Sequence, residues 1–317
     1  MESEIIGHEK ILKFFDKVIK SGNLGHAYCL IGMDNLGKRA VTESISAQLL
    51  KLKKEKLLTC PDFFFVSQEL NQKTGKTKKN IDISQIRKLR QFLSGHAFLG
   101  GYKIAIIDNA EKMNVSAANA LLKTLEEPTA KTIIFLITKN EESLPETIIS
   151  RSQLVYFKPV DKSKIEKALV QMGLDEKGAD EMSRLSLGLP GRALVWFKDP
   201  ESFENYKNEV ARFTSLLGEP FYKKMKNIED LFGDKSDHIA TRANLQKVLD
   251  VWQLLIRDKI FNRIGLSDNT VHKIDSDTVI DQKESLSIME VIQEAKILLD
   301  QNIHPRLLLT KILIKLP

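Results

Sequence analysis

Cysteine is scarce in this chain of 317 residues, which has only Cys29 and Cys60. Two thiols cannot form the several bridges of a small disulfide-rich domain, or a four-thiolate zinc site. Long apolar runs are also missing, since no window approaches the roughly 18 apolar residues that span a membrane. The first residues lack the basic segment and apolar run of a secretory signal. We therefore expect a cytoplasmic protein with no membrane partner.

Neither sign of charge dominates the sequence. Lys and Arg number 48 against 42 Asp and Glu, so the formal net charge is +6. Hydrophobic residues make up 42% and charged residues 28%, a globular composition that excludes a wholly disordered or collagen-like chain. The mild basic excess permits nucleic acid nearby without requiring it. At about 150 residues per domain, the length predicts two or three domains.

Short apolar runs alternate with helical periodicity through the first half. Runs whose β-branched and aromatic content favours buried strands cover 27–31, 63–66, 104–107, 133–138 and 154–157. Helical patterns cover 39–52, 84–93 and 117–125. This alternation predicts a five-stranded parallel sheet built from βαβ units.

Strand patterns stop after Pro159, and the rest of the chain reads as helices. Short helices are predicted at 161–172, 177–187 and 192–197, and longer amphipathic ones from about Pro200, ending in 285–300 and 305–316. Pro305 suits the first position of the last helix. That helix is apolar nearly all round, which predicts burial in its own domain or against a partner.

A glycine-rich turn follows the first predicted strand and opens a helix. Gly32, Gly37 and Lys38 fit the phosphate-binding pattern G-x-x-x-x-G-K. In that pattern backbone N–H groups cradle phosphates, the Lys reaches the terminal phosphates, and a Ser or Thr follows to hold magnesium. Arg39 stands at that last position, and a guanidinium cannot ligate a cation.

The second element of a phosphate site is altered too. Asp108 ends the apolar strand 103–107, as a magnesium-orienting acid should. A hydrolytic site usually has Glu next, to polarise the attacking water, but this chain has Asn109. Glu111 lies two residues further on, and we expect it on a different side of the turn.

Three interpretations of this region stay open from the residues themselves. An active ATPase or kinase would need both missing groups. A degenerate fold that has lost catalysis needs neither, and could retain or lose ATP or ADP; Lys38 needs no magnesium to bind phosphate. A glycine turn that merely resembles a phosphate loop is the third.

Longer motifs identify a family. Residues 121–128 read LLKTLEEP, followed by FLIT at 135–138 and LPETIISRSQ at 144–153. These resemble the signature, the sensor 1 strand and the Ser-Arg-Cys motif of AAA+ clamp-loader subunits, with Ser152 in place of Cys. The turn GLPGRAL at 188–194 and NIHPRL at 302–307 resemble the family's lid turn and collar-helix start. The resemblance spans nearly the whole chain.

The resemblance implies an architecture and a domain division. We expect a RecA-like AAA+ P-loop domain at 1–159, a helical lid at 160–204 and a C-terminal helical collar at 205–317. Family members of this kind often carry a four-cysteine zinc module, but the interval 51–60 holds only Cys60, so we expect no zinc. Cys29 and Cys60 are then simply small apolar residues.

Within the family, the chain most resembles the bacterial DNA polymerase III subunit that does not hydrolyse ATP but supplies an arginine to its neighbour. This resemblance rests on the nucleotide site, which lacks the expected residues at Arg39 and Asn109, together with the intact Ser150-Arg151 pair. The resemblance implies that Arg151 is the finger, although an ordinary surface arginine is the other interpretation. It also implies gamma/tau-like and delta-like partner subunits, and a sliding clamp and primed DNA reached through the complex.

Two further residues have alternatives that the sequence leaves open. Thr138 matches the group that senses the γ-phosphate, or it is vestigial and satisfied by backbone. Arg192 matches the family's sensor 2 arginine, or it makes a surface or interdomain salt bridge. The lysine-rich segment 73–80 is expected to be a solvated loop, with a nucleic-acid site as the alternative.

The function predicted from the sequence is a non-hydrolysing subunit of the DNA polymerase III clamp loader, which helps load the sliding clamp on primed DNA. It would need no cofactor of its own and would not be an enzyme alone, although part of a nucleotidyltransferase complex. The alternative is a self-sufficient P-loop ATPase of replication or repair. A related AAA+ replication factor working outside the polymerase is a third possibility.

Overall fold

The computed structural model describes residues 5–70, 78–129, 131–232, 238–266, 270–272, 281–301 and 303–317. Most of the lysine-rich segment 73–80 lies outside these residues, so its prediction stays open. The chain divides into two compact units, Met1–Leu194 and Val195–Pro317. Within the described part of the chain, no helix is long and apolar enough to cross a membrane.

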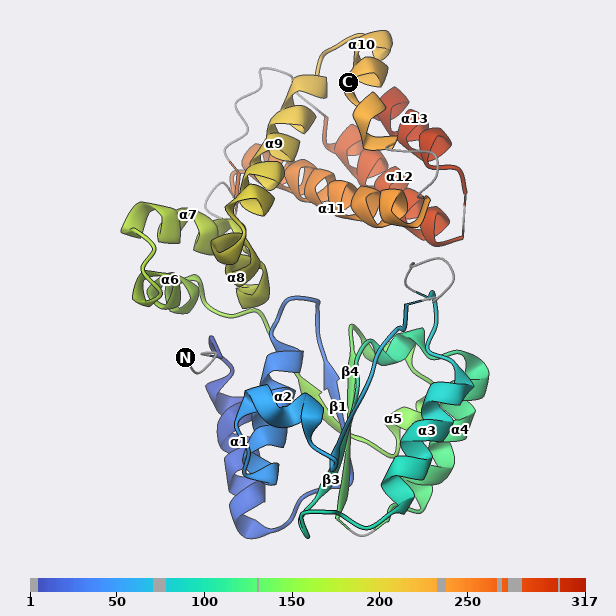
Figure 1. Cartoon of the computed structure of the whole chain (residues 1–317). Helices are drawn as coiled ribbons and strands as arrows, with labels where there is room; N and C mark the ends of the chain where they lie inside the picture. The colour runs from blue at the N-terminus through green and yellow to red at the C-terminus, as the bar shows by residue number, and fades with distance from the viewer. Residues whose placement is uncertain are drawn as a thin grey trace. The chain divides into compact units, whose positions relative to one another are not determined.

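The first unit is built on the five-stranded parallel sheet that the sequence predicts (Figure 1). Its strands are β1 (Ala27–Ile31), β2 (Phe63–Val66), β3 (Lys103–Ile107), β4 (Thr132–Thr138) and β5 (Gln153–Tyr156). The order across the sheet is β2-β3-β4-β1-β5, and every pairing is parallel. Strand β1 therefore lies between β4 and β5, and β5 forms one edge.

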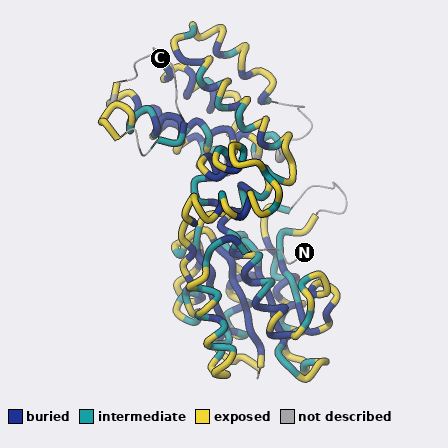
Figure 2. Tube along the Cα trace, turned by 90° about the vertical axis from the view of Figure 1, so that its left-hand side faces the viewer, coloured by how far each residue is buried: buried dark blue, intermediate teal, exposed yellow. Residues whose placement is uncertain are grey.

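Helices cover both faces of this sheet (Figure 1). They are α1 (Glu9–Ser21), α2 (Lys38–Leu50), α3 (Ile83–Ser94) and α4 (Val115–Glu126). Successive side chains of β1 point to opposite faces of the sheet. Tyr28 lies in the same hydrophobic cluster as Phe15 of α1, and Cys29 lies in the same cluster as Leu121 of α4. Each strand that is covered on both sides reads as a continuous apolar run. Figure 2 shows this buried layer running through the unit.

Short elements and a small helical group complete the first unit. The short elements are η1 (Lys54–Thr59), η2 (Ala110–Lys112), η3 (Glu141–Ser143) and α5 (Glu146–Ile149). The helical group consists of α6 (Lys162–Gln171), α7 (Glu176–Leu185) and α8 (Pro190–Lys198), the last of which continues past Leu194. The predicted helices 161–172, 177–187 and 192–197 correspond to these three. The division into domains at 159/160 and 204/205 stays a prediction.

The described residues of the second unit form helices and their connections, as the sequence predicts. It contains α9 (Pro200–Leu216), α10 (Phe221–Asn227), η4 (Glu229–Phe232), α11 (His238–Arg263), α12 (Gln282–Asp300) and α13 (Pro305–Lys315). Trp252 lies at the centre of its core, with its ring 5.6 Å from that of Phe213. Pro305 stands in the first turn of α13, as expected. The unit buries one side of α13, but Leu307 and Ile314 are each 66% exposed.

Candidate functional site

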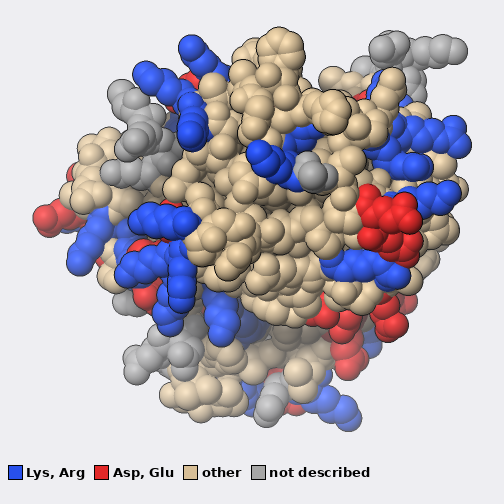
Figure 3. All heavy atoms as spheres, turned by 90° about the horizontal axis from the view of Figure 1, so that it is seen from below, with Lys and Arg blue, Asp and Glu red and all other residues tan. Residues whose placement is uncertain are grey.

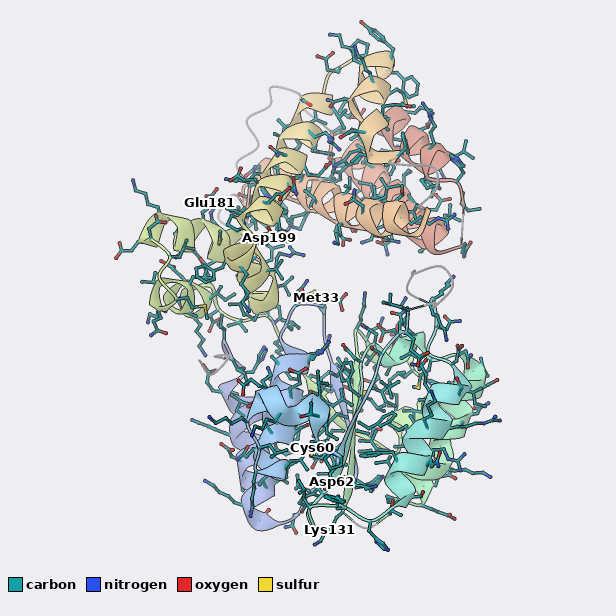
Figure 4. The ribbon with its side chains drawn as sticks, in the orientation of Figure 1. Met33, Cys60, Asp62, Lys131, Glu181 and Asp199 are labelled. Atoms are coloured by element: carbon teal, nitrogen blue, oxygen red, sulfur yellow. The ribbon has the colours of Figure 1, made fainter. Side chains whose placement is uncertain are left out.

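The phosphate-loop motif has the strand–turn–helix context that its chemistry requires. Residues 32–37 connect the end of β1 to the start of α2, at the carboxyl edge of the sheet. Gly37 has a φ of 87°, a left-handed conformation that a side chain would strain. Gly32 has a φ of 153°, and a Cβ there would lie 2.8 Å from the carbonyl oxygen of Phe157. Figure 4 labels Met33 in this loop.

Lys38 folds back on its own loop. Its side chain is buried, and Nζ donates hydrogen bonds to the carbonyl oxygens of Gly32 and of Met33, the latter at 2.9 Å. Burial lowers the pKa of Lys38, because it removes water from the ammonium group, while the carboxylate of Asp34 opposes this effect. The ammonium group of Lys38, which would bind phosphate, is thus hydrogen-bonded to carbonyl oxygens of the loop itself.

Arg39 is held by three groups around the place where a magnesium-binding hydroxyl would stand. Its Nε lies 2.7 Å from Oε1 of Glu43, and its Nη1 lies 3.7 Å from Oδ2 of Asp108. Its guanidinium carbon lies 4.4 Å from the centre of the Phe65 ring, a cation–π contact. A fixed positive charge here opposes a divalent cation, and the residue offers no oxygen to bind one. These residues do not fit magnesium.

The acidic side of the site contains one group that the motif does not call for. Burial raises the pKa of Asp108, whereas the nearby Arg39 lowers it. Asn109 takes a left-handed conformation with a φ of 53°, and its N–H donates to Oδ1 of Asp108. The carboxylate of Glu111 is the unexpected group, because its charge acts on both Lys38 and Asp108.

Glu111 lies in the short η2 helix, two residues after Asn109, and the side of the turn that it occupies stays a prediction. Both of its carboxylate oxygens are inaccessible to water and have no hydrogen-bond partner within the described residues.

The hydroxyl of Thr138 bonds to the segment that follows β4. It lies 2.9 Å from Oγ of Ser143 and donates to the carbonyl oxygen of Asn140 at 3.2 Å. The backbone of Thr138 contacts the phosphate loop, since its carbonyl oxygen accepts from the N–H of Gly32 at 3.2 Å. The sensor role of Thr138 stays a prediction.

The start of α8 lies against the phosphate loop. The N–H of Gly191 donates to the carbonyl oxygen of Asn35 at 2.7 Å, so the two backbones touch. Arg192 follows in the first turn of this helix and is half-buried. This location next to the loop is compatible with the predicted sensor 2 role of Arg192, which stays a prediction.

His8 also contacts the phosphate loop. No pattern in the sequence predicted this contact. Its Nε2 lies 2.7 Å from the carbonyl oxygen of Leu36, and its ring centre lies 4.7 Å from that of Phe157. Burial lowers the pKa of His8, with the hydrogen bond to Leu36 acting in the opposite direction. His8 therefore connects the entry to α1 with the phosphate loop. The residues Ile-Gly-His-Glu at 6–9 carry no signal of a partner for the imidazole.

Arg151 lies in the turn between α5 and β5, where it is held by groups of the same chain. Its Nη2 lies 2.9 Å from Oε1 of Glu126, the last residue of α4. Its Nη1 donates to the carbonyl oxygen of Thr147 at 3.0 Å and to Oγ of Ser150 at 3.3 Å. The side chain is 36% exposed, so a second molecule can reach it.

Arg151 and the phosphate loop lie at opposite edges of the sheet. Gly32 follows the carboxyl end of β1, whereas Arg151 precedes the amino end of the parallel strand β5. At about 3.3 Å per residue, the five steps from residue 151 to 156 separate the two edges by roughly 17 Å. A single arginine side chain does not bridge that distance, so Arg151 cannot complete the phosphate site of its own chain.

The cysteines show no sign of metal binding. Cys29 is fully buried in β1, and burial raises the pKa of its thiol to about 12. Cys60 is also buried, and Figure 4 labels it near Asp62. Within the described part of the chain, no cluster of three or more His, Cys, Asp or Glu side chains could hold a metal ion. The absence of zinc stays a prediction.

Comparison with known proteins shows which proteins this chain is similar to. Residues 7–161 match the family model described as "DNA polymerase III, delta subunit". The chain is 41% identical over 140 residues to DNA polymerase III subunit delta' of Pseudomonas aeruginosa, covering 40% of this chain and 41% of that one. It is 30% identical over 202 residues to the subunit delta' of Escherichia coli, covering 58% and 59%.

A further relative aligns over more of the chain. The subunit delta' of Bacillus subtilis is 25% identical over 283 residues, which cover 83% of this chain and 80% of that one. The matches thus span about two fifths and three fifths of the first two relatives and four fifths of this one. Among solved structures, a DNA polymerase III gamma subunit-related protein from Thermotoga maritima has a TM-score of 0.54 at 20% identity, covering 95% of this chain and 97% of that one. That likeness confirms the fold, a parallel sheet covered by helices and followed by further helices.

Proposed function

Because residues 7–161 match a DNA polymerase III subunit family and the chain is similar to delta' subunits, we propose that it is a clamp-loader subunit that does not hydrolyse ATP but supplies Arg151 to a neighbouring subunit's ATP site. The observation that carries the proposal is the location of Arg151. It is exposed at the edge of the sheet opposite its own phosphate loop, so only the phosphates of another molecule are within its reach.

The chemistry of a guanidinium suits this role. A planar, permanently charged group delivered from outside stabilises negative charge that grows on a transferring γ-phosphate. Arg151 has a partner in Glu126 that it can exchange for phosphate, because the ion pair between them is partly exposed. Nucleotide bound by the neighbour would then also bridge the two subunits.

The state of the chain's own site supports the absence of hydrolysis. Arg39 stands where a magnesium ligand is needed, and Asn109 stands where a water-polarising carboxylate is needed. Residual binding of ATP or ADP stays part of the proposal, because Lys38 could exchange the loop carbonyls for phosphate oxygens.

The proposed partners follow from the same role. A gamma/tau-like motor subunit would bind the ATP that Arg151 contacts, and a delta-like subunit would complete the ring. The sliding clamp and primed DNA would be engaged by the whole assembly in DNA replication. The names of the relatives support a clamp-loader subunit of DNA polymerase III, while each named partner remains a proposal for this chain.

The test is ATP hydrolysis by a reconstituted ring. Rings that contain the wild-type chain, Arg151→Ala, Arg151→Lys or the control Arg87→Ala are compared with clamp and primed DNA present, after gel filtration has shown equal assembly. Arg87 is an exposed arginine on α3, on a different element from the finger. We expect Arg151→Ala to slow hydrolysis tenfold or more, which is about 1.4 kcal/mol of barrier. Arg151→Lys should not rescue it fully, because Lys lacks the planar fork.

The chain alone, assayed at the same concentration, should show no ATP turnover above a Gly37→Ala, Lys38→Ala double variant. Turnover by the isolated wild-type chain that the double variant abolishes would favour the self-sufficient ATPase instead. An unchanged ring rate with Arg151→Ala would show that Arg151 is no finger.

A further inference from the structure

One face of α1 carries a row of lysines that the proposed function does not use. Lys10, Lys13, Lys17 and Lys20 are all exposed, and we call them the α1 lysine face. At 3.6 residues per turn, the four side chains fall within an arc of about 80° on the helix surface. Opposite this face, Phe15 is buried in the core, so the orientation of α1 is fixed by packing.

The lysines of this face are not held in ion pairs. Within the described residues, none of the four lysines makes an ion pair. Of the two acids of α1, Glu9 pairs with Lys164 at 2.8 Å, whereas Asp16 accepts from the neutral Nε2 of Gln48 at 3.1 Å and offsets part of the positive charge. Figure 3 shows basic side chains on both sides of the view, including the left, the side on which α1 and α2 lie in Figure 1.

The spacing matches a line of phosphates. Ten residues of helix separate Lys10 from Lys20, a distance of about 15 Å. One strand of a duplex carries a phosphate every 3.4 Å of axis, so this length spans roughly four phosphates. Lys13, Lys17, Lys20 and Ser21 also line a shallow open hollow of about 510 Å³, together with Asp16.

The face is polar throughout, which decides the class of partner. No large apolar side chain of α1 is exposed, although several lie elsewhere on the chain. A membrane surface or an amphipathic acidic peptide would require apolar contacts beside the charge. Flexible, separate ammonium groups suit a backbone of phosphates read without regard to sequence.

From these observations we infer that the α1 lysine face binds the phosphate backbone of nucleic acid directly. The inference rests on the proposed function only for its setting at primed DNA. Binding by the chain alone is measured without partner subunits, so failure here leaves the Arg151 test unaffected. The α1 lysine face thus supplies part of the DNA contact that we expect of the whole complex.

The experiment measures fluorescence anisotropy of the full chain with a labelled duplex of about 25 base pairs, and with a single strand of the same length, over a series of salt concentrations. The variant Lys13→Glu, Lys17→Glu is compared with the control Lys88→Glu, Lys167→Glu. The control removes two exposed lysines from α3 and α6, so the net charge changes equally. Circular dichroism and melting temperature confirm that all three proteins fold.

We expect wild-type and control proteins to bind both probes and to lose roughly a hundredfold in affinity for duplex between 50 and 200 mM salt, as for about four phosphate contacts. The α1 variant should bind at least tenfold more weakly, with a salt slope smaller by about 1.8 for duplex and about 1.4 for the single strand. A preference for one probe identifies the strandedness without changing the site.

Two results would overturn the inference. One is equal weakening by the two double variants, which would show that only net charge matters. The other is displacement of both probes by polyglutamate at equal charge concentration, which would favour an acidic protein partner.

Discussion

Arg39 of the phosphate loop and Asp108 of the neighbouring acidic strand face each other, with Nη1 and Oδ2 3.7 Å apart. In a magnesium-dependent site, a bound cation would stand between a hydroxyl and this carboxylate. Here the protein supplies the positive charge itself. The contacts of Arg39 with Glu43 and Phe65 keep the guanidinium in place.

Arg39→Thr should therefore open the site to magnesium. Threonine restores the missing hydroxyl and removes the competing charge, so we expect magnesium to strengthen nucleotide binding tenfold or more, or about 1.4 kcal/mol. Titration of a fluorescent ATP analogue with and without magnesium measures this effect. Arg39→Ala is the matched control, because it removes the charge without adding a ligand.

Adding Asp108→Asn to Arg39→Thr should abolish the gain, since the carboxylate would no longer orient the metal. If magnesium has no effect on any of these proteins, the block lies elsewhere in the loop, and the hydrogen bonds of Lys38 to the loop carbonyls become the explanation.

Glu126→Gln should free Arg151 without harming the fold. The pair is partly exposed, with side chains 47% and 36% accessible, so its loss should change stability by no more than about 1 kcal/mol. Because Glu126 competes with phosphate for the guanidinium, hydrolysis by the reconstituted ring should stay equal or rise up to about fivefold. A fall as large as that of Arg151→Ala would instead make Glu126 part of the contact with the neighbour.

His8 should make stability depend on pH. Burial lowers the pKa of His8 below 6.5 in the folded chain. As the pH falls, His8 is therefore protonated in the unfolded chain before it is protonated in the folded chain. The stabilisation linked to neutral His8 is therefore complete above about pH 6.5 and is lost as the pH falls through the lowered folded value. Melting temperatures of wild type and His8→Gln, compared at about pH 8 and pH 5.5, should differ less at the acid value. A constant difference would contradict this linkage.

Gly191→Ala should separate α8 from the phosphate loop. A Cβ at this position would lie 2.8 Å from the carbonyl oxygen of Asn35 and 3.0 Å from its Cα, and backbone atoms cannot easily give way. We expect a loss of about 1–3 kcal/mol in the free energy of unfolding, as for an overpacked core. Gly101→Ala is the control, since a Cβ there meets nothing within 4 Å. Equal melting temperatures for the two variants would contradict the tight contact.

Much of the architecture was predictable, because a strand that is buried on both faces of the sheet has a continuous apolar run in its sequence. The apolar runs that predicted β1, β3 and β4 are the strands whose residues are buried throughout. The strand boundaries differ from the predicted ones by one residue or none. Helix α1 was not predicted, although its apolar residues include the fully buried Phe15.

Side-chain contacts across the site were less predictable. The motif showed that Arg39 and Asn109 stand where a live site needs other groups, and this followed from residue identity alone. It could not show that Arg39 pairs with Asp108, or that the carboxylate oxygens of Glu111 are buried with no hydrogen-bond partner within the described residues. These features depend on segments brought together from distant parts of the chain.

The sequence by itself determined the parallel sheet, the phosphate-loop turn and its missing magnesium ligand, because each follows from local patterns of residue type. The tertiary structure alone decided which groups meet. It brings Arg39 to Asp108 across neighbouring elements, and it puts Arg151 at the opposite edge of the sheet from the loop. The physical reason is that strand order and direction fix these distances, and the order β2-β3-β4-β1-β5 arises from packing between segments far apart along the chain.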